Sequence, residues 1–327
     1  MAEPEEKISV VMCTYNGARF LREQLDSILN QTLLPAEIIV QDDGSSDETL
    51  DILKEYAAKT TLVKIYQNEG AHGINSNFFT AMQRASGDLI ALSDQDDIWE
   101  ADKLRLQAEA IGDKLLCSGF SEPFSTEGYP VSFDRRRPNY HILRLAYLGA
   151  LPGHTFLMRK ELPCYLKNWE SSPYLYDWQL QMVAAAAESI AFVDETLVHF
   201  RRHAGAATAN IPVANQLASA STFHYISVTF LHHRQLQVVV RERFQHILRL
   251  LDSLPFHTES VAECREMAQL QVGRSFWNFL CRTAFFVRHR EVLFYVRESG
   301  GWLTFFRALF FPFSCGYYYR GILKRNK

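Results

Sequence analysis

Short apolar runs alternate with amphipathic segments between residues 8 and 92 of this chain. The runs are rich in β-branched side chains and predict buried strands at residues 8–13, 37–41, 63–66 and 88–92. The intervening segments predict helices at residues 19–30, 48–59 and 77–85, with a flexible loop at 70–75. Strands and helices that alternate through short connections build a parallel sheet with right-handed crossovers. The pattern therefore predicts an α/β fold, with a mostly parallel sheet flanked by helices.

Polar clusters follow three of these predicted strands, and ligands of parallel sheets bind at the carboxyl ends of the strands. The clusters are Thr14-Tyr15-Asn16, Asp42-Asp43-Gly44 and Asp94-Gln95-Asp96-Asp97. Neither G-x-G-x-x-G after the first strand nor G-x-x-x-x-G-K-[ST] occurs in the chain, which argues against a dinucleotide enzyme or a P-loop NTPase. We therefore expect a ligand site of a different kind at this edge of the sheet.

The stretch from Asp94 to Asp97 places three carboxylates at the end of a predicted strand. Carboxylates this close repel each other unless a cation neutralises them, and hard oxygen ligands suit Mg²⁺ or Mn²⁺. The alternative is a solvated acidic loop that caps the helix predicted at about residues 99–111, with Asp97 as the cap. The stretch alone leaves both interpretations open.

The next part of the chain completes the sheet and adds an irregular segment. Residues 115–117 and 190–193 predict strands, 149–158 a loop that enters a strand, and 177–188 a helix. Residues 121–139 are polar and rich in Gly and Pro, which predicts a mobile loop or insertion. Its three arginines at 135–137 suit a phosphate, although a solvated basic loop is an equal alternative.

Beyond Ala206 the pattern becomes helical, with predicted helices at about residues 216–254 and 261–287. Residues 271–327 contain ten Lys/Arg and two Glu, a local charge of +8 in a chain of net charge −3, and many aromatic side chains. Basic and aromatic residues together suit an anionic membrane surface. The alternatives are a helical subdomain that packs on the rest of the chain, or a dimer contact.

Several general features set the expected location. The six cysteines show no paired or metal-ligand spacing, which indicates reduced thiols in the cytoplasm. The acidic N-terminus leads directly into a strand and does not resemble a signal peptide. We expect no transmembrane helix, because no run of about eighteen uncharged apolar residues occurs, and no nucleic-acid partner, because the chain is not basic.

Five motifs in this order resemble family 2 glycosyltransferases of the GT-A fold: V-V-M-C-T-Y-N-G, Q-D-D-G-S-S-D-E-T, S-D-Q-D-D-I-W, Y-D-W and R-R-H. The resemblance covers about residues 8–208, and the third and fourth motifs look most like those of bacterial rhamnosyltransferases that build cell-wall or capsular polysaccharide. It implies a GT-A type, Rossmann-like catalytic domain at residues 1–208, with a nucleotide-binding half (1–110) and an acceptor half (111–208). Residues 209–327 would then form a helical C-terminal region.

The resemblance also implies roles on the donor side. Those assigned to the nucleotide sugar are Thr14, Tyr15, Asn16, Asp43, Asn77 and Asp94, with the Tyr15 ring stacked on the base and Asp43 accepting a base N–H. The metal ligands would be Asp96 and His203. Without the resemblance, Asp43 is an ordinary turn residue and His203 a structural histidine. Relatives often have Lys or Arg in the helix-entry segment, where this chain has Ile74-Asn75-Ser76-Asn77.

On the acceptor side, the resemblance makes Asp177 the general base that deprotonates the attacking hydroxyl in an inverting transfer. Gly153, His154 and Trp178 would line the acceptor. A plain helix N-cap is the structural alternative for Asp177, and core or turn roles are the alternatives for the other three residues.

The expected function is an inverting glycosyltransferase that depends on Mn²⁺ or Mg²⁺. The first candidate donor is dTDP-L-rhamnose, and the acceptor would be a growing surface polysaccharide or a lipid-linked glycan. Alternatives are a UDP-hexose or galactofuranose donor, a Mg²⁺-dependent nucleotidyltransferase, and a non-enzymatic sugar-binding module. We expect a cytoplasmic protein that contacts the inner face of the cell membrane, with a homodimer as a further alternative.

Overall fold

A computed structural model describes residues 6–167, 169, 172–205, 222–294 and 301–319. The chain forms two compact units. The first unit comprises residues 1–137, 151–184 and 189–204, and the second comprises residues 138–150, 185–188 and 205–327. Residues 138–150 lie within the predicted acceptor half in sequence, but they cluster with the second unit.

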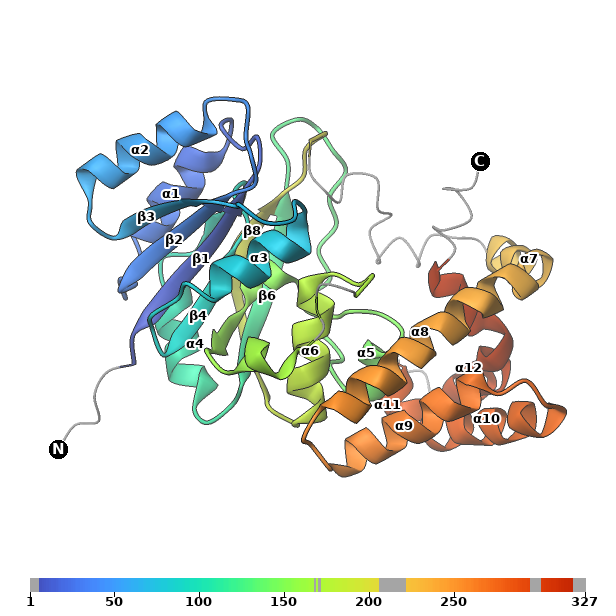
Figure 1. Ribbon diagram of the computed structural model, residues 1–327. Helices are drawn as coiled ribbons and strands as arrows, with labels where there is room; N and C mark the ends of the chain where they lie inside the picture. Colours follow the sequence, from blue (N-terminus) through green and yellow to red (C-terminus); the bar gives the residue numbers. More distant parts are fainter. Residues whose placement is uncertain (1–5, 168, 170–171, 206–221, 295–300, 320–327) are drawn as a thin grey trace. The chain divides into compact units, whose positions relative to one another are not determined.

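The first unit is built on a mixed sheet whose strand order, over the described residues, is β3-β2-β1-β4-β7-β6-β8-β5 (Figure 1). The strands are β1 (Ile8–Thr14), β2 (Glu37–Asp42), β3 (Val63–Gln67), β4 (Leu89–Ser93), β5 (Ile98–Trp99), β6 (Leu116–Phe124), β7 (Leu157–Arg159) and β8 (Ile190–Arg201). Strands β3, β2, β1 and β4 pair in parallel, as do β6 and β8, whereas β7 and β5 run antiparallel to their neighbours. The predicted mostly parallel sheet is confirmed.

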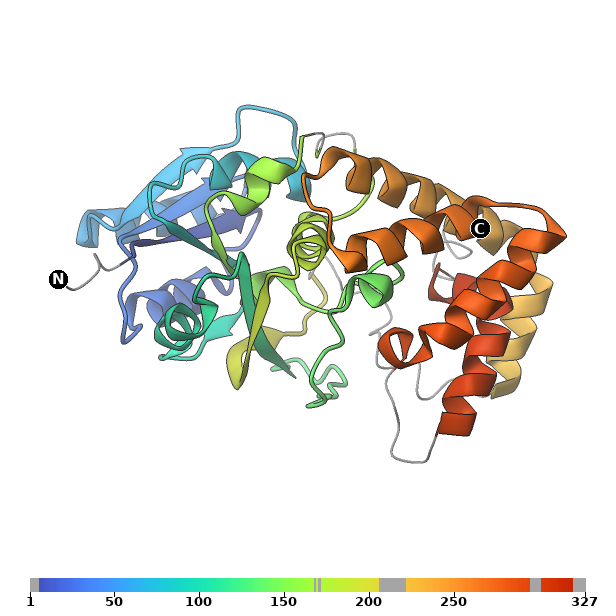
Figure 2. The same ribbon diagram turned by 90° about the horizontal axis from the view of Figure 1, so that it is seen from below.

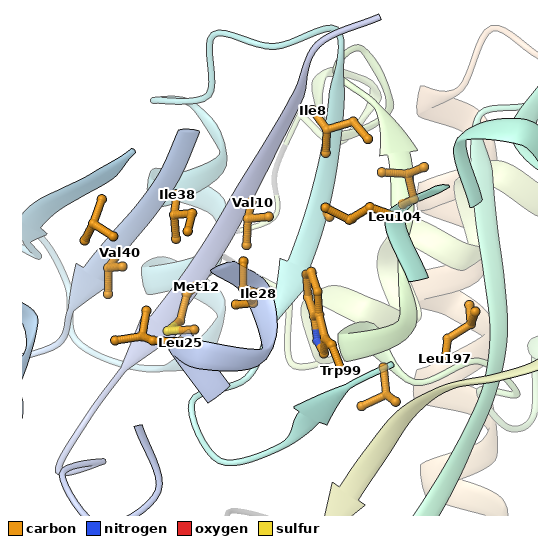
Figure 3. Close-up of a cluster of buried hydrophobic side chains, with 14 of the residues drawn as sticks. Ile8, Val10, Met12, Leu25, Ile28, Ile38, Val40, Trp99, Leu104 and Leu197 are labelled. Carbon is orange, nitrogen blue, oxygen red and sulfur yellow. The ribbon is translucent and has the colours of Figure 1, made fainter. Parts of the chain in front are cut away.

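Helices cover both faces of this sheet. Apolar side chains of α1 (Leu21–Leu29), α2 (Thr49–Lys59) and α4 (Lys103–Ile111) pack on the face that carries Val10 and Met12 (Figure 3). The opposite face carries Gln41 and meets α3 (Ile74–Met82), which in turn contacts α6 (Tyr176–Ala186) through stacked Phe78 and Tyr176 rings. Burial of β1, β2 and β4 on both faces explains why these strands read as continuous apolar runs.

The structure corrects three boundaries. Helix α3 begins at Ile74, inside the loop predicted at 70–75. Trp99 belongs to β5 and not to a helix, because β5 pairs with β8 from Ile98↔His199 onward, so α4 begins only at Lys103. The predicted loop 121–139 starts as strand, since β6 continues alongside β8 to Phe124. In the last two cases, pairing with β8, which is distant in the sequence, makes these residues strand.

The second unit is helical, as predicted for the C-terminal region. Its elements are α5 (Ile142–Leu145), α7 (Thr222–Leu231), α8 (His233–Ser253), α9 (Glu259–Val272), α10 (Phe276–Arg288), α11 (Arg290–Leu293), α12 (Gly301–Ser314) and the 3-10 helix η5 (Cys315–Tyr319). Helices α10 and α12 pack side by side (Figure 2). Tyr147 is buried at the centre of this unit, with the Phe244 and Phe311 ring centroids each 4.9 Å away.

Parts of the predicted C-terminal region fall outside the described residues: the start of the helix expected at 216, the domain boundary at 208 and 209, and the basic end at 320–327. Among the helices that are described, none combines the length and the apolar composition needed for a membrane span. The cysteines are free thiols.

Lys103 is a buried amine in the core of the first unit. Its Nζ donates to Gln107 Oε1 over 2.8 Å and lies 3.9 Å from the centroid of the Trp99 ring. Burial lowers the pKa of Lys103 to about 7. Because an unfolded lysine titrates near 10.5, the unfolded chain binds more protons than the folded chain between these two values, and stability rises with pH there.

We therefore expect Lys103→Met to change the pH dependence of folding. Relative to the variant, the native protein should gain up to about 1.4 kcal/mol of unfolding free energy per pH unit between about pH 7 and pH 10. Urea unfolding followed by tryptophan fluorescence at several pH values measures this difference. Parallel curves for the two proteins would show that Lys103 is not a neutralised buried amine.

Candidate active site

The ends of β1 and β2 are joined by a buried carboxylate. Thr14 Oγ1 donates to Asp42 Oδ1 over 2.8 Å, and Asp42 also accepts the backbone N–H groups of Gly44 and Ser45. Gly44 has a φ of +88°, in the left-handed region that favours glycine. Thr14 and Asp42 therefore shape the turn, and they leave Asp43 as the carboxylate nearer to solvent.

Asp43 holds the loop that follows β3. Its Oδ1 accepts from Asn68 Nδ2 over 2.7 Å and lies 3.1 Å from His72 Nδ1, while its Oδ2 accepts the Gly73 N–H over 2.8 Å. The side chain predicted to bind a base is thus placed at the rim but is already bonded within the protein. A base N–H would have to share or replace one of these contacts.

Gln95 connects the turn after β1 to the acidic stretch. Its side-chain amide accepts the Tyr15 N–H over 2.9 Å and donates to the Tyr15 carbonyl over 3.0 Å. The Tyr15 ring itself is 58% exposed, which leaves its face open to a base. Asn16, with a φ of +48°, accepts the Ser46 N–H and so ties the first turn to the second.

Asn77 is placed differently from the other predicted donor-side residues. Its side chain is buried, and it exchanges hydrogen bonds with Gln41: Asn77 Nδ2 donates to the Gln41 carbonyl, and Gln41 Nε2 donates to Asn77 Oδ1. These bonds fix α3 against β2. The Asn77 side chain is therefore not exposed at the rim beside Tyr15 and the acidic stretch.

Asp96 and His203 lie together, with 2.8 Å between Asp96 Oδ2 and His203 Nε2. Burial and the neighbouring charge of Asp94 raise the pKa of Asp96, more strongly than the contact with His203 lowers it. The edge of the Phe20 ring faces the His203 ring at a centroid distance of 4.8 Å. The two side chains predicted to bind a metal ion are therefore neighbours, although the chain separates them by more than a hundred residues.

Asp97 is fully buried and does not cap a helix, which corrects the alternative expected for it. Its Oδ1 accepts the Arg201 N–H over 3.1 Å, and its Oδ2 has no hydrogen-bond partner among the described residues. Burial is the main cause that raises the pKa of Asp97 to about 8, opposed by His154 and supported by Asp94 and Asp96. The carboxylate is held in place by β8, across the sheet from the strand that it follows.

His154, predicted on the acceptor side, lies beside the carboxylates of Asp94 and Asp97. Its Nδ1 is 3.3 Å from Asp94 Oδ2 and 3.5 Å from Asp97 Oδ2, and its Nε2 is 2.7 Å from Ser121 Oγ. Burial alone would lower the pKa of His154, but the charges of Asp97 and Asp94 outweigh burial and raise it. The ring also stacks on Phe200, with a centroid distance of 5.3 Å. His154 therefore balances the charge of this cluster.

Arg201 is a site residue that the sequence analysis missed. The side chain is 2% exposed, donates from Nε to the Asp96 carbonyl over 2.9 Å and pairs with Glu23 over 2.8 Å. Its guanidinium carbon lies 4.4 Å and 4.6 Å from the ring centroids of Phe20 and Phe124. The R-R-H motif contained the signal, but that motif was interpreted only for its histidine. Arg201 positions the backbone that carries Asp96 and Asp97.

Asp177 stands at the start of α6 beside two buried rings. Its Oδ1 accepts the Trp178 N–H over 2.6 Å. Burial raises the pKa of Asp177 to about 6; the bond from Trp178 opposes this increase, and the charge of Asp94 adds to it. Trp178 is buried beside Tyr174, and a Cβ on Gly153 would meet the Tyr176 hydroxyl at 2.5 Å. Gly153 thus lets Tyr176 pack closely next to Asp177.

The carboxylate and imidazole side chains of this site fit a divalent cation. Carboxylate oxygens and imidazole nitrogens are ligands that Mn²⁺ accepts, and Asp94, Asp97 and His154 present atoms within 4.8 Å of one another. Within this set, Oδ2 of buried Asp97 accepts no hydrogen bond from the described residues, although it lies 3.5 Å from His154 Nδ1. Asp96 with His203 forms a second, more open set, and Asp94 neighbours both sets. These five side chains could therefore hold a metal ion together with a bound phosphate.

Comparison with known proteins identifies relatives of part of this chain. The family model described as glycosyl transferase family 2 matches residues 9–159. The putative glycosyltransferase EpsH of Bacillus subtilis is 25% identical over 210 residues, 60% of this chain and 61% of that protein. The UDP-Glc:alpha-D-GlcNAc-diphosphoundecaprenol beta-1,3-glucosyltransferase WfgD of Escherichia coli is 38% identical over 100 residues, 31% of this chain and 39% of its own. The chain thus spans about three fifths or less of the length of these curated relatives.

A solved structure resembles a larger part of the chain. S. aureus TarS 1–349, crystallised in complex with UDP-GlcNAc, aligns with a TM-score of 0.56 and 18% identity, covering 88% of this chain and 81% of that chain. A likeness at this level of identity concerns the fold. It confirms the expected GT-A type architecture.

Proposed function

Residues 9–159 belong to glycosyl transferase family 2, and from this premise we propose that the protein transfers a sugar from a nucleotide diphosphate donor to an acceptor hydroxyl with inversion. The observation that carries the proposal is that Asp177 lies near the acidic stretch: burial is the main cause that raises the pKa of Asp177, and the charge of Asp94 adds to it. A donor phosphate site and a general base must be adjacent for such a transfer. A sugar-binding module would need neither group in this arrangement.

Donor binding is assigned to residues 1–110. The exposed Tyr15 ring offers a stacking face for the base, and Asp43, held by the Gly73 N–H, offers a carboxylate at the same rim. Thr14, Asn16 and Asn77 support these turns from behind. Asp94, the most exposed of the three aspartates, faces the ribose and the phosphates.

Asp96 and His203 are proposed to hold Mn²⁺ or Mg²⁺, with Asp94 beside them. When bound, such a cation neutralises the charge that develops on the departing diphosphate. Arg201 fixes the Asp96 carbonyl and the Asp97 carboxylate, so the stretch from Asp94 to Asp97 is preorganised before the donor arrives.

Acceptor binding is assigned to residues 111–208. The acceptor hydroxyl gives its proton to Asp177 as its oxygen attacks the anomeric carbon from the face opposite the diphosphate. A pKa raised to about 6 keeps Asp177 ionised at neutral pH and makes it a stronger base than an ordinary aspartate. Gly153 and Trp178 shape the wall beside it, through Tyr176 and Tyr174 respectively.

The identity of the donor sugar is a separate and more specific part of the proposal. The resemblance to rhamnosyltransferases favours dTDP-L-rhamnose, whereas the UDP-GlcNAc bound to TarS and the UDP-Glc in the name of WfgD favour a UDP-hexose. The name of WfgD also supports a lipid-linked diphosphate glycan as the acceptor, and growing polysaccharide is the alternative. Contact with a membrane surface follows from such an acceptor, and a homodimer is a separate proposal.

A donor screen tests this function. We expect slow hydrolysis of one nucleotide sugar, with release of nucleoside diphosphate, only when Mn²⁺ or Mg²⁺ is present. The panel includes dTDP-L-rhamnose, UDP-glucose, UDP-GlcNAc and UDP-galactofuranose. A nucleotidyltransferase would instead release diphosphate from a nucleoside triphosphate and a sugar phosphate. Activity of that kind, or no thermal stabilisation by any nucleotide sugar, would contradict the proposal.

A further inference from the structure

The second unit exposes large apolar side chains on three helices. Trp277 on α10 is 72% exposed, and Trp302 on α12 is 78% exposed. Phe276, Phe306 and Leu231, the last at the end of α7, are also exposed. Trp302, Phe306 and Leu309 follow one another at helical spacing, so α12 presents an apolar stripe to its surroundings.

Ring contacts connect the three helices into one surface, here called the aromatic face. The Phe279 ring of α10 lies 5.2 Å from Phe313 of α12, and Phe230 of α7 lies 6.4 Å from Phe313. His233, at the start of α8, lies 6.0 Å from the same Phe313 ring. The exposed side chains therefore stand on helices that pack against one another and not on separate loops.

The charged side chains of the three helices that carry the aromatic face have one sign. Helices α7, α10 and α12 contain Arg282, Arg288 and Arg307 and no Asp or Glu. A face of aromatic rings and cations complements a surface that is apolar below and negative above, as a membrane with anionic lipids is. A two-fold contact between copies would bring these cations toward each other without carboxylates from the same helices.

A cluster of arginines adjoins the aromatic face. Arg282 of α10 lies 5.9 Å from the Phe279 ring centroid and donates from Nη1 to Gln271 Oε1 over 3.0 Å. The Nε–H groups of Arg241 and Arg282 are buried and have no hydrogen-bond partner within the described residues. Burial is the main cause that lowers the pKa of Arg241, and the charges of Arg274 and Arg282 lower it further. Arg241 and Arg282 thus each keep an unpartnered N–H, and Arg274 is near enough for its charge to act on Arg241. Guanidinium N–H groups are donors that phosphate oxygens accept.

We propose that the aromatic face lies on a membrane that contains anionic lipids, and that Arg241, Arg274 and Arg282 bind a lipid phosphate there. This inference rests on the membrane contact of the proposed function, and it specifies which lipids and which side chains make that contact. Trp277 and Trp302 enter the headgroup region, where an indole buries its ring and keeps its N–H near water. Because α10 and α12 lie on the surface, no spanning helix is required.

Sedimentation of the full chain with vesicles tests the inference. We expect binding to phosphatidylcholine vesicles that contain phosphatidylglycerol, and weak binding to phosphatidylcholine alone. Combining Arg241→Gln, Arg274→Gln and Arg282→Gln should weaken binding to the anionic vesicles by roughly fivefold per arginine. A double variant, Trp277→Ser with Trp302→Ser, should lose about tenfold or more for each ring.

Matched controls separate these effects from changes in charge or folding. Arg249→Gln removes an exposed arginine from α8 away from the cluster, and Tyr129→Ser removes an exposed ring from the first unit; both should bind like the native chain. Brominated lipids should quench tryptophan fluorescence in the native chain but not in the double tryptophan variant. Circular dichroism checks that each variant is folded.

Several results would overturn the inference: equal binding to both kinds of vesicle, unchanged binding of the arginine and tryptophan variants, or a dimer in solution that the tryptophan variant abolishes. The last result would assign the face to a second copy of the chain. Hydrolysis of the soluble donor is measured on the same samples. Loss of vesicle binding with intact hydrolysis concerns this inference alone, whereas intact binding without any hydrolysis contradicts the proposed transferase.

Discussion

Asp177→Asn is expected to abolish sugar transfer, with a loss on the order of 10²–10⁴-fold in turnover. Asparagine has nearly the same shape, and its Oδ1 can still accept the Trp178 N–H that Asp177 accepts in the native chain. It cannot take a proton from the acceptor hydroxyl. Donor binding should therefore persist, and the measurement is transfer to acceptor beside a thermal shift with the donor.

The pH dependence gives Asp177 a second signature. A general base must be ionised, and burial raises the pKa of Asp177 to about 6, so transfer should fall as the pH decreases through about 6. Folding responds in the opposite direction. Since the folded chain favours protonated Asp177, ionisation opposes folding from about pH 4 upward, and Asp177→Asn should unfold no more easily than the native chain at pH 7.

Asp51→Asn is the matched control, because this aspartate is exposed on α2 and its ion pair with Lys54 lies at the surface. It should retain native transfer and a native pH profile. If Asp177→Asn transferred sugar at the native rate, or if it lost transfer only because it unfolded, the base would have to be sought among the other carboxylates of the rim.

The regular part of the fold could be predicted because its signals are local. Strands β1, β2 and β4 are buried on both faces, which forces continuous apolar runs, and α1 and α2 bury one face each, which forces helical spacing. Strand β5 has only Ile98 and Trp99 and exists because β8 pairs with it. No local pattern marks such a strand, so Trp99 and the residues after it are predicted as helix.

The site was predictable where it lies at the ends of these strands. Thr14 is the last residue of β1, and Tyr15, Asp43 and Asp94 directly follow strands that the alternation predicts. His154 could not be placed in this way, because it enters the cluster from η1 (Gly153–Thr155), which leads into the antiparallel strand β7, and the pattern does not predict the direction of that strand. Arg201 acts through a backbone N–H and a buried side chain, and both depend on the pairing of β8.

Burial gives Asp97 a different role from the one that the sequence suggests. In the sequence it is one of three carboxylates within four residues, and a helix cap is the simplest role for it. In the structure Asp94 and Asp96 retain access to solvent, whereas Asp97 is enclosed. Only the course of β8 and the position of His154 distinguish them, and these are tertiary properties.

Asp96→Asn is expected to remove the dependence of donor hydrolysis on Mn²⁺ or Mg²⁺ and to slow hydrolysis by about 10²–10³-fold. An asparagine oxygen is a much weaker ligand for a hard cation than a carboxylate, while its size leaves the neighbouring His203 ring in place. Titration of hydrolysis against the metal concentration measures the effect. A higher metal requirement with a recoverable maximum rate would indicate that Asp96 is one of several ligands.

The control distinguishes a ligand from a charge near the site. Glu100→Gln removes a carboxylate from the same segment, where it contacts His199 at the surface, and it should leave the metal titration unchanged. Asp97→Asn distinguishes the two candidate ligand sets, because Asp97 belongs to the set with His154 and Asp94. If Asp96→Asn kept the native metal titration while Asp97→Asn lost it, the cation would lie at the buried set, and the assignment of Asp96 and His203 would be wrong.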